Sequence, residues 1–170
     1  MEPIDLLKQD HFGRWSIIND GVMGGLSWSQ IAEQTSKDES YNLQFSGKVS
    51  LENNGGFAST TRPITDEDRQ TLAKHKATKI VLTTQGDGQQ YQLRLKTENG
   101  AITYKTLFHT QKDKVQHWLF SPQEFIETFR GQEFPNSDKP NFANLSDIGF
   151  LISNKQPGPF QLQILSLAIR

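Results

Sequence analysis

The sequence predicts an all-β fold: one jelly-roll β-sandwich domain over residues 1–170, with one or two short helices. Hydrophobic and polar residues alternate in many short segments, a pattern typical of strands whose two faces meet different surroundings. Turn-forming Gly, Asn, Asp and Pro residues separate these segments at close spacing. The aromatic residues, 11 Phe, 3 Trp and 3 Tyr, also favour strands over helices. A length of 170 residues is typical of one domain with a substantial core.

The most regular alternation predicts a strand at residues 90–97. Successive side chains of a strand point to opposite faces, so the apolar set should face the core and the polar set should face outward. The inward set is Tyr91, Leu93 and Leu95, and the outward set is Gln92, Arg94 and Lys96. A second strand at 101–109 follows the turn signal Glu-Asn-Gly at 98–100, so the two strands are expected to form a β-hairpin.

Other segments with strand patterns lie along the whole chain. They are residues 41–51, 78–85, 115–121, 147–153 and 159–169. In the last segment the apolar parity changes next to Ile164. This change predicts a bulge, or a strand that passes from one sheet to the other near that residue.

Two segments carry helix signals. Residues 65–75 begin with a capping Thr, place acidic residues in the first turn and end with basic residues, which suits the helix dipole. Residues 121–131 begin with Ser121, followed by Pro and then by Glu124 as in a capping box, and Gly131 stands where the helix would end. Two short helices between strands are therefore expected.

Charge and composition exclude several classes of function. The formal net charge is -1 and no run of Lys or Arg stands out, so the chain lacks the electrostatic pattern of a nucleic-acid-binding protein. Cysteine is absent, which excludes disulfides, thiolate catalysis and Cys-based metal sites. No window approaches the roughly 18 continuous apolar residues of a spanning helix, so membrane insertion is not expected. Residues 1–15 show neither a secretory nor a transit pattern, which predicts a cytoplasmic protein.

No catalytic or cofactor motif is present in the sequence. The four histidines lack metal-ligand spacing, and nucleophile-elbow, Walker A and dinucleotide fingerprints are absent. No pair of carboxylates has a context that would separate their pKa values, as a glycosidase pair requires. We therefore expect no enzyme activity, no cofactor and no metal. A structural calcium ion held by oxygens of Asp20, Asn53 and Asn54 is an alternative to their role as turn formers.

The glycine-rich stretch from Asn19 to Ser27 raises the question of a ligand-binding loop. Asn-Asp-Gly supplies residues that tolerate positive φ in a tight turn, and Gly24 and Gly25 would let the chain pass close to another element. We interpret these glycines as structural. A phosphate nest is the alternative, but no helix N-terminus or Lys follows the stretch.

Five blocks of sequence carry a family resemblance. In order, they are WSIINDGVMGGLS, LQFSGKVSLENNGGFAS, GDGQQYQLRLKT, SPQEFIETFRG and IGFLISNKQPGPFQLQI. Together they resemble the complex I intermediate-associated protein family, from about residue 15 to 169. The positions that match as a structural signature are Trp15, Asp20, Gly21, Gly24, Gly25, Gly55, Gly56, Phe57, Arg130 and Gly131.

The resemblance implies a galactose-binding-domain-like β-sandwich, similar in architecture to carbohydrate-binding modules. Founding members of the family are mitochondrial assembly factors that hold early intermediates of NADH:ubiquinone oxidoreductase, and bacterial relatives stand alone. This sequence differs in two ways. It has no mitochondrial presequence, and the Arg expected soon after the Gly-Gly-Phe-Ala-Ser block, Arg62, comes one residue later.

Three functions follow from these observations. The first is a non-enzymatic protein-binding module, an assembly factor or chaperone-like adaptor for a multisubunit complex such as a respiratory one. The second is a module that binds carbohydrate or another small polar ligand, as the implied fold suggests. The third, an enzyme for a small polar molecule, is disfavoured because no acid–base pair is recognisable.

The candidate binding residues are those with polar or aromatic side chains expected to reach solvent. Gln92, Arg94 and Lys96 would lie on the outer face of their strand, and Trp28 lies in a polar segment that suggests exposure. Arg62 is included because of its place in the family pattern. The alternatives are a solvated or salt-bridged cation for Arg94 and a core position for the tryptophan.

Overall fold

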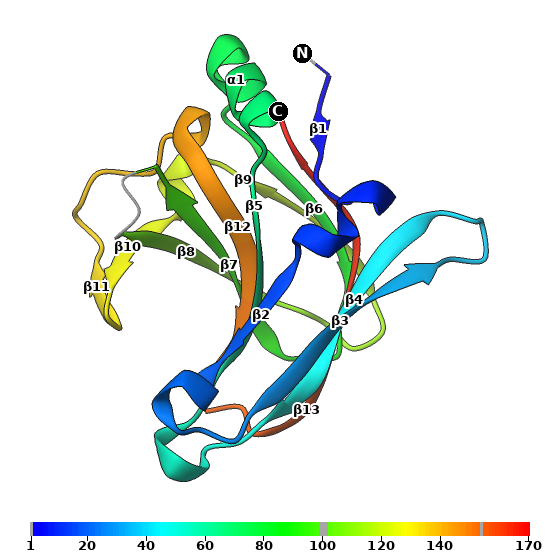
Figure 1. Ribbon diagram of the computed structural model, residues 1–170, viewed down its shortest axis with the longest axis vertical. Coiled ribbons are helices and arrows are strands. Elements are labelled where there is room, and N and C mark those ends of the chain that lie inside the picture. Colours follow the sequence, from blue (N-terminus) through cyan, green and yellow to red (C-terminus); the bar gives the residue numbers. More distant parts are fainter. Residues whose placement is uncertain (1, 99–101, 154) are drawn as a thin grey trace.

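Two antiparallel β-sheets packed face to face form the fold in the computed structural model, which describes residues 2–98, 102–153 and 155–170 (Figure 1). Strand accounts for most of the regular structure, and the predicted jelly-roll β-sandwich is confirmed. The turn expected at 98–100 lies largely outside the described residues. Both ends of the chain lie at the top of Figure 1, next to α1.

The first sheet, called sheet A, has the order β3-β4-β13-β6-β9, with β1 added on β13. Its strands are β1 (Ile4–Asp5), β3 (Trp28–Thr35), β4 (Tyr41–Val49), β6 (Ile80–Gln85), β9 (Val115–Phe120) and β13 (Gly158–Ile169). The strands predicted at 41–51, 78–85, 115–121 and 159–169 are all confirmed. The β3–β4 hairpin extends away from the body of the molecule (Figure 1).

The second sheet, called sheet B, has the order β11-β10-β8-β7-β12-β5-β2. Its strands are β2 (Ser16–Asn19), β5 (Ala58–Pro63), β7 (Gln90–Thr97), β8 (Thr103–His109), β10 (Ile126–Phe129), β11 (Gln132–Phe134) and β12 (Leu145–Ile152). β7 and β8 pair as the predicted hairpin, from Gln90 opposite His109 to Lys96 opposite Thr103.

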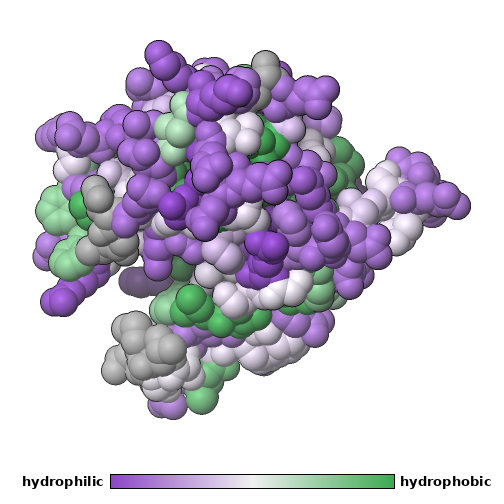
Figure 2. Space-filling model, turned by 45° about the horizontal axis from the view of Figure 1, so that its top comes forward, coloured by the Kyte–Doolittle hydropathy of each residue, from purple (hydrophilic) through white to green (hydrophobic). Residues whose placement is uncertain are grey.

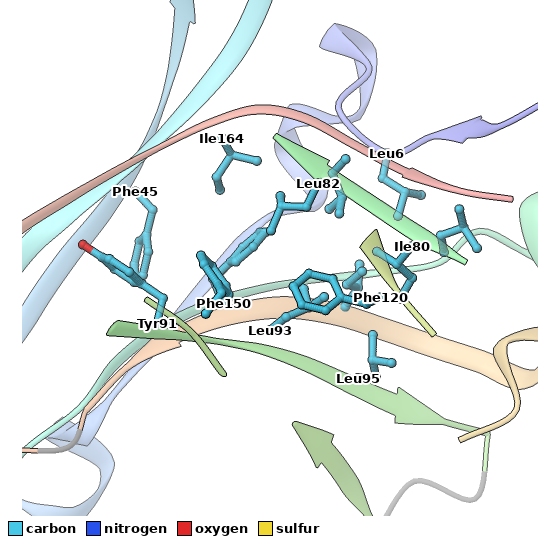
Figure 3. Packing of buried hydrophobic residues seen from close by; sticks show 14 of the residues in the cluster. Leu6, Phe45, Ile80, Leu82, Tyr91, Leu93, Leu95, Phe120, Phe150 and Ile164 are labelled. Atoms are coloured by element: carbon cyan, nitrogen blue, oxygen red, sulfur yellow. The ribbon is translucent and has the colours of Figure 1, made fainter. Parts of the chain in front are cut away.

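The core fills the space between the two sheets. The residues predicted to point inward from β7, namely Tyr91, Leu93 and Leu95, are fully buried. In Figure 3 Tyr91 lies beside Phe45, and Leu95 lies below Ile80 and Phe120, all three of which come from sheet A. Alternation along the strand therefore assigned the inner face of β7 correctly, and it leaves the other side chains of that strand for the outer face.

The bulge predicted in the last strand is confirmed. β13 pairs with β6 through Ile164 opposite Thr84 and Ser166 opposite Thr83, so Leu165 is the extra residue. The shift brings apolar residues of both parities to the core, since Leu162, Ile164, Leu167 and Ile169 are all fully buried. The strand stays within sheet A, so the alternative of a crossing between sheets is wrong.

One α-helix, α1 (Asp66–His75), is found among the described residues, together with five short 3-10 turns. The side chain of Thr65 caps α1 by accepting a hydrogen bond from the Asp68 backbone N–H at 3.0 Å, as predicted. The 3-10 turns are η1 (Gln9–Arg14), η2 (Asp20–Met23), η3 (Glu52–Asn54), η4 (Pro122–Glu124) and η5 (Phe142–Asn144).

The helix predicted at 121–131 is wrong. The expected cap contact forms, because the Ser121 N–H donates to Glu124 Oε2 at 2.9 Å, but the chain makes only the single turn η4 before entering β10. Phe125 is fully buried against the ring of Phe142, with the ring centroids 5.9 Å apart. The segment after it pairs with β8, and tertiary packing and sheet pairing thus override the local helix signal.

Arg130 and Gly131 form the turn between β10 and β11 instead of ending a helix. Both have positive φ, 50° and 80°, as the tight turn of a two-residue hairpin requires. Their structural role is therefore a hairpin turn, and this turn carries the Arg130 side chain to the rim of the outer face of sheet B.

Candidate binding cleft on sheet B

The outer face of sheet B is hollowed into a cleft of about 900 Å³. Side chains from β2, β5, β7, β8, β10 and β12 line it, along with the β10–β11 turn. The predicted outward set Gln92, Arg94 and Lys96 lies in this cleft, but Gln92 is buried there, with 5% of its surface exposed, whereas Lys96 is exposed as expected. The view in Figure 2 shows a largely hydrophilic surface with a hollow toward its lower left.

Strand register places Arg94 in the middle of the cleft. Its Cα neighbours are Lys105 on β8 and Gly149 on β12. Gly149 contributes no side chain, and it tolerates none, because an added Cβ would lie 2.3 Å from the Thr60 carbonyl oxygen. The floor of the cleft beside Arg94 is therefore bare backbone.

The guanidinium of Arg94 is half-buried and has no acidic partner. Its Nη1 donates to Oε1 of Gln92 at 2.8 Å, and Gln92 Nε2 donates to Ser153 Oγ at 3.3 Å, which orients the amide. Every Asp and Glu of the chain lies in the described part, and none forms an ion pair with Arg94. Burial lowers the pKa of Arg94, because desolvation disfavours the charged form.

The other charged groups in the cleft give it a positive balance. Lys105 Nζ pairs with Glu133 Oε1 at 2.6 Å, and Asp147 Oδ2 accepts from Ser146 Oγ at 2.8 Å. Among the described lining residues there are four cations, Arg94, Lys96, Lys105 and Arg130, and two carboxylates, Glu133 and Asp147. Alternation along the predicted strand 101–109 could have identified Lys105 as a residue of the outer face. Its ion pair with Glu133, by contrast, depends on the β10–β11 hairpin, which the sequence did not indicate.

The described lining of the cleft contains no Trp or Tyr. Its aromatic residues are Phe57, which is half-buried, and Phe150, which is fully buried. Trp28 lies on β3 of sheet A and is 54% exposed, as expected from its polar surroundings. It lines a smaller hollow of about 470 Å³ with Leu26 and Leu51, so the structure does not bring Trp28 together with Arg94.

Arg62 is also absent from the cleft. It points to the inner side of β5 and is fully buried, where its Nε donates to the Pro63 carbonyl at 2.8 Å and its Nη1 to the Leu6 carbonyl at 3.0 Å. Burial lowers its pKa, with the nearby Asp68 acting in the opposite direction. This position does not support a binding role: Arg62 fastens the N-terminal segment to the sheet.

The glycine-rich stretches of the signature meet around one carboxylate. Asp20 is fully buried, and its oxygens accept from the Ser27 N–H at 3.0 Å, the Ser27 Oγ at 2.5 Å, the Gly56 N–H at 2.7 Å and the Phe57 N–H at 3.3 Å. Burial raises the pKa of this carboxyl, but the hydrogen bonds from Ser27, Gly56 and Phe57 outweigh it, so the pKa is lowered overall. We call this arrangement the Asp20 cluster.

The Asp20 cluster explains the glycines around it. An added Cβ on Gly25 would lie 2.4 Å from Asp20 Cγ, and one on Gly55 would lie 2.6 Å from Asp20 Oδ2. The positive φ expected of Asn-Asp-Gly occurs instead at Gly24 (87°), with Gly56 (145°) in the facing stretch. By contrast, an added Cβ on Gly21 would contact nothing within 4 Å.

Neither a phosphate nest nor a calcium site is favoured by these contacts. The N–H groups that could hold an anion already bind Asp20, and the Asp20 oxygens already accept from donors. Within the described residues, no group of three or more His, Cys, Asp or Glu side chains is placed to hold a metal ion. The Asp20 cluster thus joins two loops, as expected for a structural signature.

The sequence pattern described as complex I intermediate-associated protein 30 matches residues 4–164, nearly the whole chain. The chain belongs to this family. No curated protein matches it. The family match includes both the Asp20 cluster and the strands that build the cleft.

Solved structures similar to this family member include carbohydrate-binding modules and an agarase. A family 11 carbohydrate-binding module from Clostridium thermocellum, in complex with a β-1,3-1,4-mixed-linked tetrasaccharide, has a TM-score of 0.69 and 14% identity, covering 98% of this chain and 94% of its own. The family 11 carbohydrate-binding module of the cellulosomal cellulase Lic26A-Cel5E from that organism has a TM-score of 0.69 and 14% identity, covering 98% of this chain and 95% of its own. An exo-β-agarase has a TM-score of 0.60 and 10% identity, covering 100% of this chain and 25% of its own. At these identities the likeness shows the fold.

The described residues include no helix that has both the length and the apolar character needed to cross a membrane.

Proposed function

We propose that this chain is a non-enzymatic protein-binding module, an assembly factor or chaperone-like adaptor for a multisubunit complex, and that it binds its partner in the cleft on sheet B. The observation that carries the proposal is Arg94, a half-buried cation without an acidic partner at the centre of a cleft whose described lining has no Trp or Tyr. Membership of a family described by association with a complex I intermediate supports an assembly role.

The lining of the cleft suits a protein partner. Protein interfaces are enriched in Arg, and interface cores combine apolar contact with well-placed polar groups. Here Arg94 lies between Gln92 and Lys96 on its strand and opposite Lys105 and Gly149 on the adjacent strands. Ile18 at one end of the cleft is 44% exposed. Both carboxylates in the cleft are engaged by other side chains, so neither is set apart as a general acid or base.

A second candidate is a carbohydrate-binding module. The observation that favours it is the set of polar groups on the same face, including Ser59, Thr61 and Gln92, which could bind sugar hydroxyls. Against it, sugar-binding sites generally present an aromatic ring for stacking, and the exposed tryptophan lies in the other hollow.

Affinity capture tests the proposal. Tagged wild type, Arg94→Ala and Lys37→Ala would be incubated with lysate of the source organism, and the retained proteins would be measured by mass spectrometry. Lys37 is an exposed cation in the β3–β4 turn, outside the cleft, and serves as the charge-matched control.

We expect wild type and Lys37→Ala to retain the subunits of one complex, and Arg94→Ala to lose them. Retention that is equal for all three proteins would overturn the assignment of the cleft. If no protein is retained but neutral oligosaccharides bind to wild type and not to Arg94→Ala, the carbohydrate candidate replaces the first.

A further inference from the structure

The centre of the cleft contains a positive charge that the chain itself does not neutralise. Lys105 is paired with Glu133, but Arg94, Lys96 and Arg130 form no ion pair within the described residues, which include every Asp and Glu. A half-buried cation is stabilised when an anion of suitable geometry is brought to it. The missing counter-charge therefore belongs to something that binds.

We propose that the cleft binds an acidic segment of the partner protein, with a carboxylate of that segment paired to the Arg94 guanidinium. This inference rests on the proposed protein-binding function and specifies the chemistry of the partner. Arg94 presents a planar fork of N–H donors that matches a carboxylate in two parallel hydrogen bonds.

The guanidinium is held ready for such a contact. One nitrogen, Nη1, is fixed by Gln92, which is itself fixed by Ser153. No nitrogen of Arg94 is among the fully buried atoms that lack a partner; those atoms belong to Asn42, Arg62, Asp68 and Arg69. The remaining donors of Arg94 are therefore accessible from the cleft, and Gly149 leaves the space beside them free of side chain.

The width of the outer face of sheet B suggests which other residue of the bound segment accompanies the carboxylate. Register aligns Gln92, Leu151, Ser59 and Ile18 in one row across β7, β12, β5 and β2. Strands lie about 4.8 Å apart, so the row from β7 to β2 is about 14 Å long. An extended segment covers that distance in about four or five residues. The Arg94 guanidinium is hydrogen-bonded to Gln92, at the β7 end of this row. An acidic residue paired to Arg94 therefore goes with an apolar residue about four or five positions away, on the exposed Ile18.

Selection from a random 12-residue peptide library displayed on phage tests the inference. Wild type would be the bait, with Lys37→Ala as the second bait and Arg94→Gln for counter-selection. Recovered peptides would be synthesised, and their affinities measured by fluorescence anisotropy. We expect enrichment of Asp or Glu with an apolar residue about four or five positions away.

A double-mutant cycle then isolates the contact. We expect Arg94→Gln to weaken binding of a selected peptide by about 10- to 100-fold, as for a charge-assisted hydrogen-bonded pair, and the acid-to-amide change in the peptide to have a similar effect. The two changes together should weaken binding by much less than the product of the single effects. Lys96→Gln should weaken it only a few-fold, and thermal unfolding would verify that each variant is folded.

Three outcomes would overturn the inference: no peptide is recovered, the recovered peptides lack acidic residues, or acidic peptides bind Arg94→Gln as well as wild type. A fourth is binding of uronic-acid oligosaccharides that depends on Arg94 while no peptide binds, which would assign an acidic glycan instead. If lysate capture depends on Arg94 but the selected peptides are not acidic, the proposed function stands and only this inference fails.

Discussion

Two charged side chains, Asp20 in the turn after β2 and Arg94 on β7, are both withdrawn from solvent, but the chain satisfies only the first with its own groups. The Asp20 carboxylate accepts hydrogen bonds from Ser27, Gly56 and Phe57, which together satisfy its charge. Among the described residues, the Arg94 guanidinium has one neutral acceptor, Gln92, and no carboxylate. A buried charge that the chain satisfies stabilises the fold, and one that it leaves unsatisfied is available for a ligand.

Removing the Asp20 carboxylate should have the largest effect on stability. Asp20→Ala leaves the N–H groups of Ser27, Gly56 and Phe57 without their acceptor inside the protein, so the free energy of unfolding should fall by about 3 kcal/mol or more. Urea unfolding followed by circular dichroism measures the loss. A decrease below about 1 kcal/mol would show that Asp20 is not the link between the two loops.

Crowding the same carboxylate should have the next largest effect. Gly25→Ala places a Cβ 2.4 Å from Asp20 Cγ, and the strain should lower the free energy of unfolding by about 1–3 kcal/mol. Gly21→Ala is the matched control, because its Cβ would meet nothing within 4 Å, and it should stay within about 0.5 kcal/mol of wild type. Equal losses in the two variants would contradict the steric explanation.

Lowering the pH should destabilise the fold through protonation of Asp20. Its pKa in the folded state lies below the ordinary value of 3.8, so its stabilising contribution is complete above that value and is lost as the pH falls through the folded-state pKa. Asp20→Asn cannot titrate, and its stability should depend less on pH in this range. Melting temperatures of the two proteins between pH 5 and the acid limit of folding provide the test, and parallel curves would count against the interpretation.

Replacing Arg94 should have the smallest effect on stability. Arg94→Met removes a half-buried charge without an acidic partner, so the free energy of unfolding should change by less than about 1 kcal/mol, or rise. Arg62→Met is the contrasting variant, because it removes hydrogen bonds to two carbonyls, and it should lose about 1–2 kcal/mol. Thermal or urea unfolding of both variants distinguishes the two arginines; a large loss for Arg94→Met would make it structural.

Alternation of apolar and polar residues made part of the fold and of the cleft predictable from the sequence. On β7 the inner and outer sets follow from a period of two, so the core role of Leu93 and the outward position of Arg94 could both be inferred. On β5, Arg62 follows Ser59, Thr60 and Thr61, and a run of polar residues gives no alternation from which to assign an inner side. Arg62 is included among the binding residues because of its place in the family pattern, and alternation offers no check on that choice; the structure buries it.

Other features depend on contacts between distant segments, which a sequence pattern does not reveal. The capping box at Ser121 specifies only the first turn, and the fate of the next residues is decided by packing of Phe125 and pairing with β8. The glycines around Asp20 are interpreted as structural from local turn chemistry alone, whereas the carboxylate that leaves no room for a Cβ lies five residues from Gly25 and much farther along the chain from Gly55. Only the folded chain shows why they are needed.

The pairing of β1 with β13 places Ile4 directly opposite Ile169. Figure 1 shows these two ends together at the top of the view, with the η2 and η3 loops at the bottom. A short linker could join them, and a circular permutant opened in the β3–β4 turn would keep the strand pairing of both sheets. The module could equally be inserted into a surface loop of a host protein, where two adjacent connections would restrict its orientation more than a single linker does.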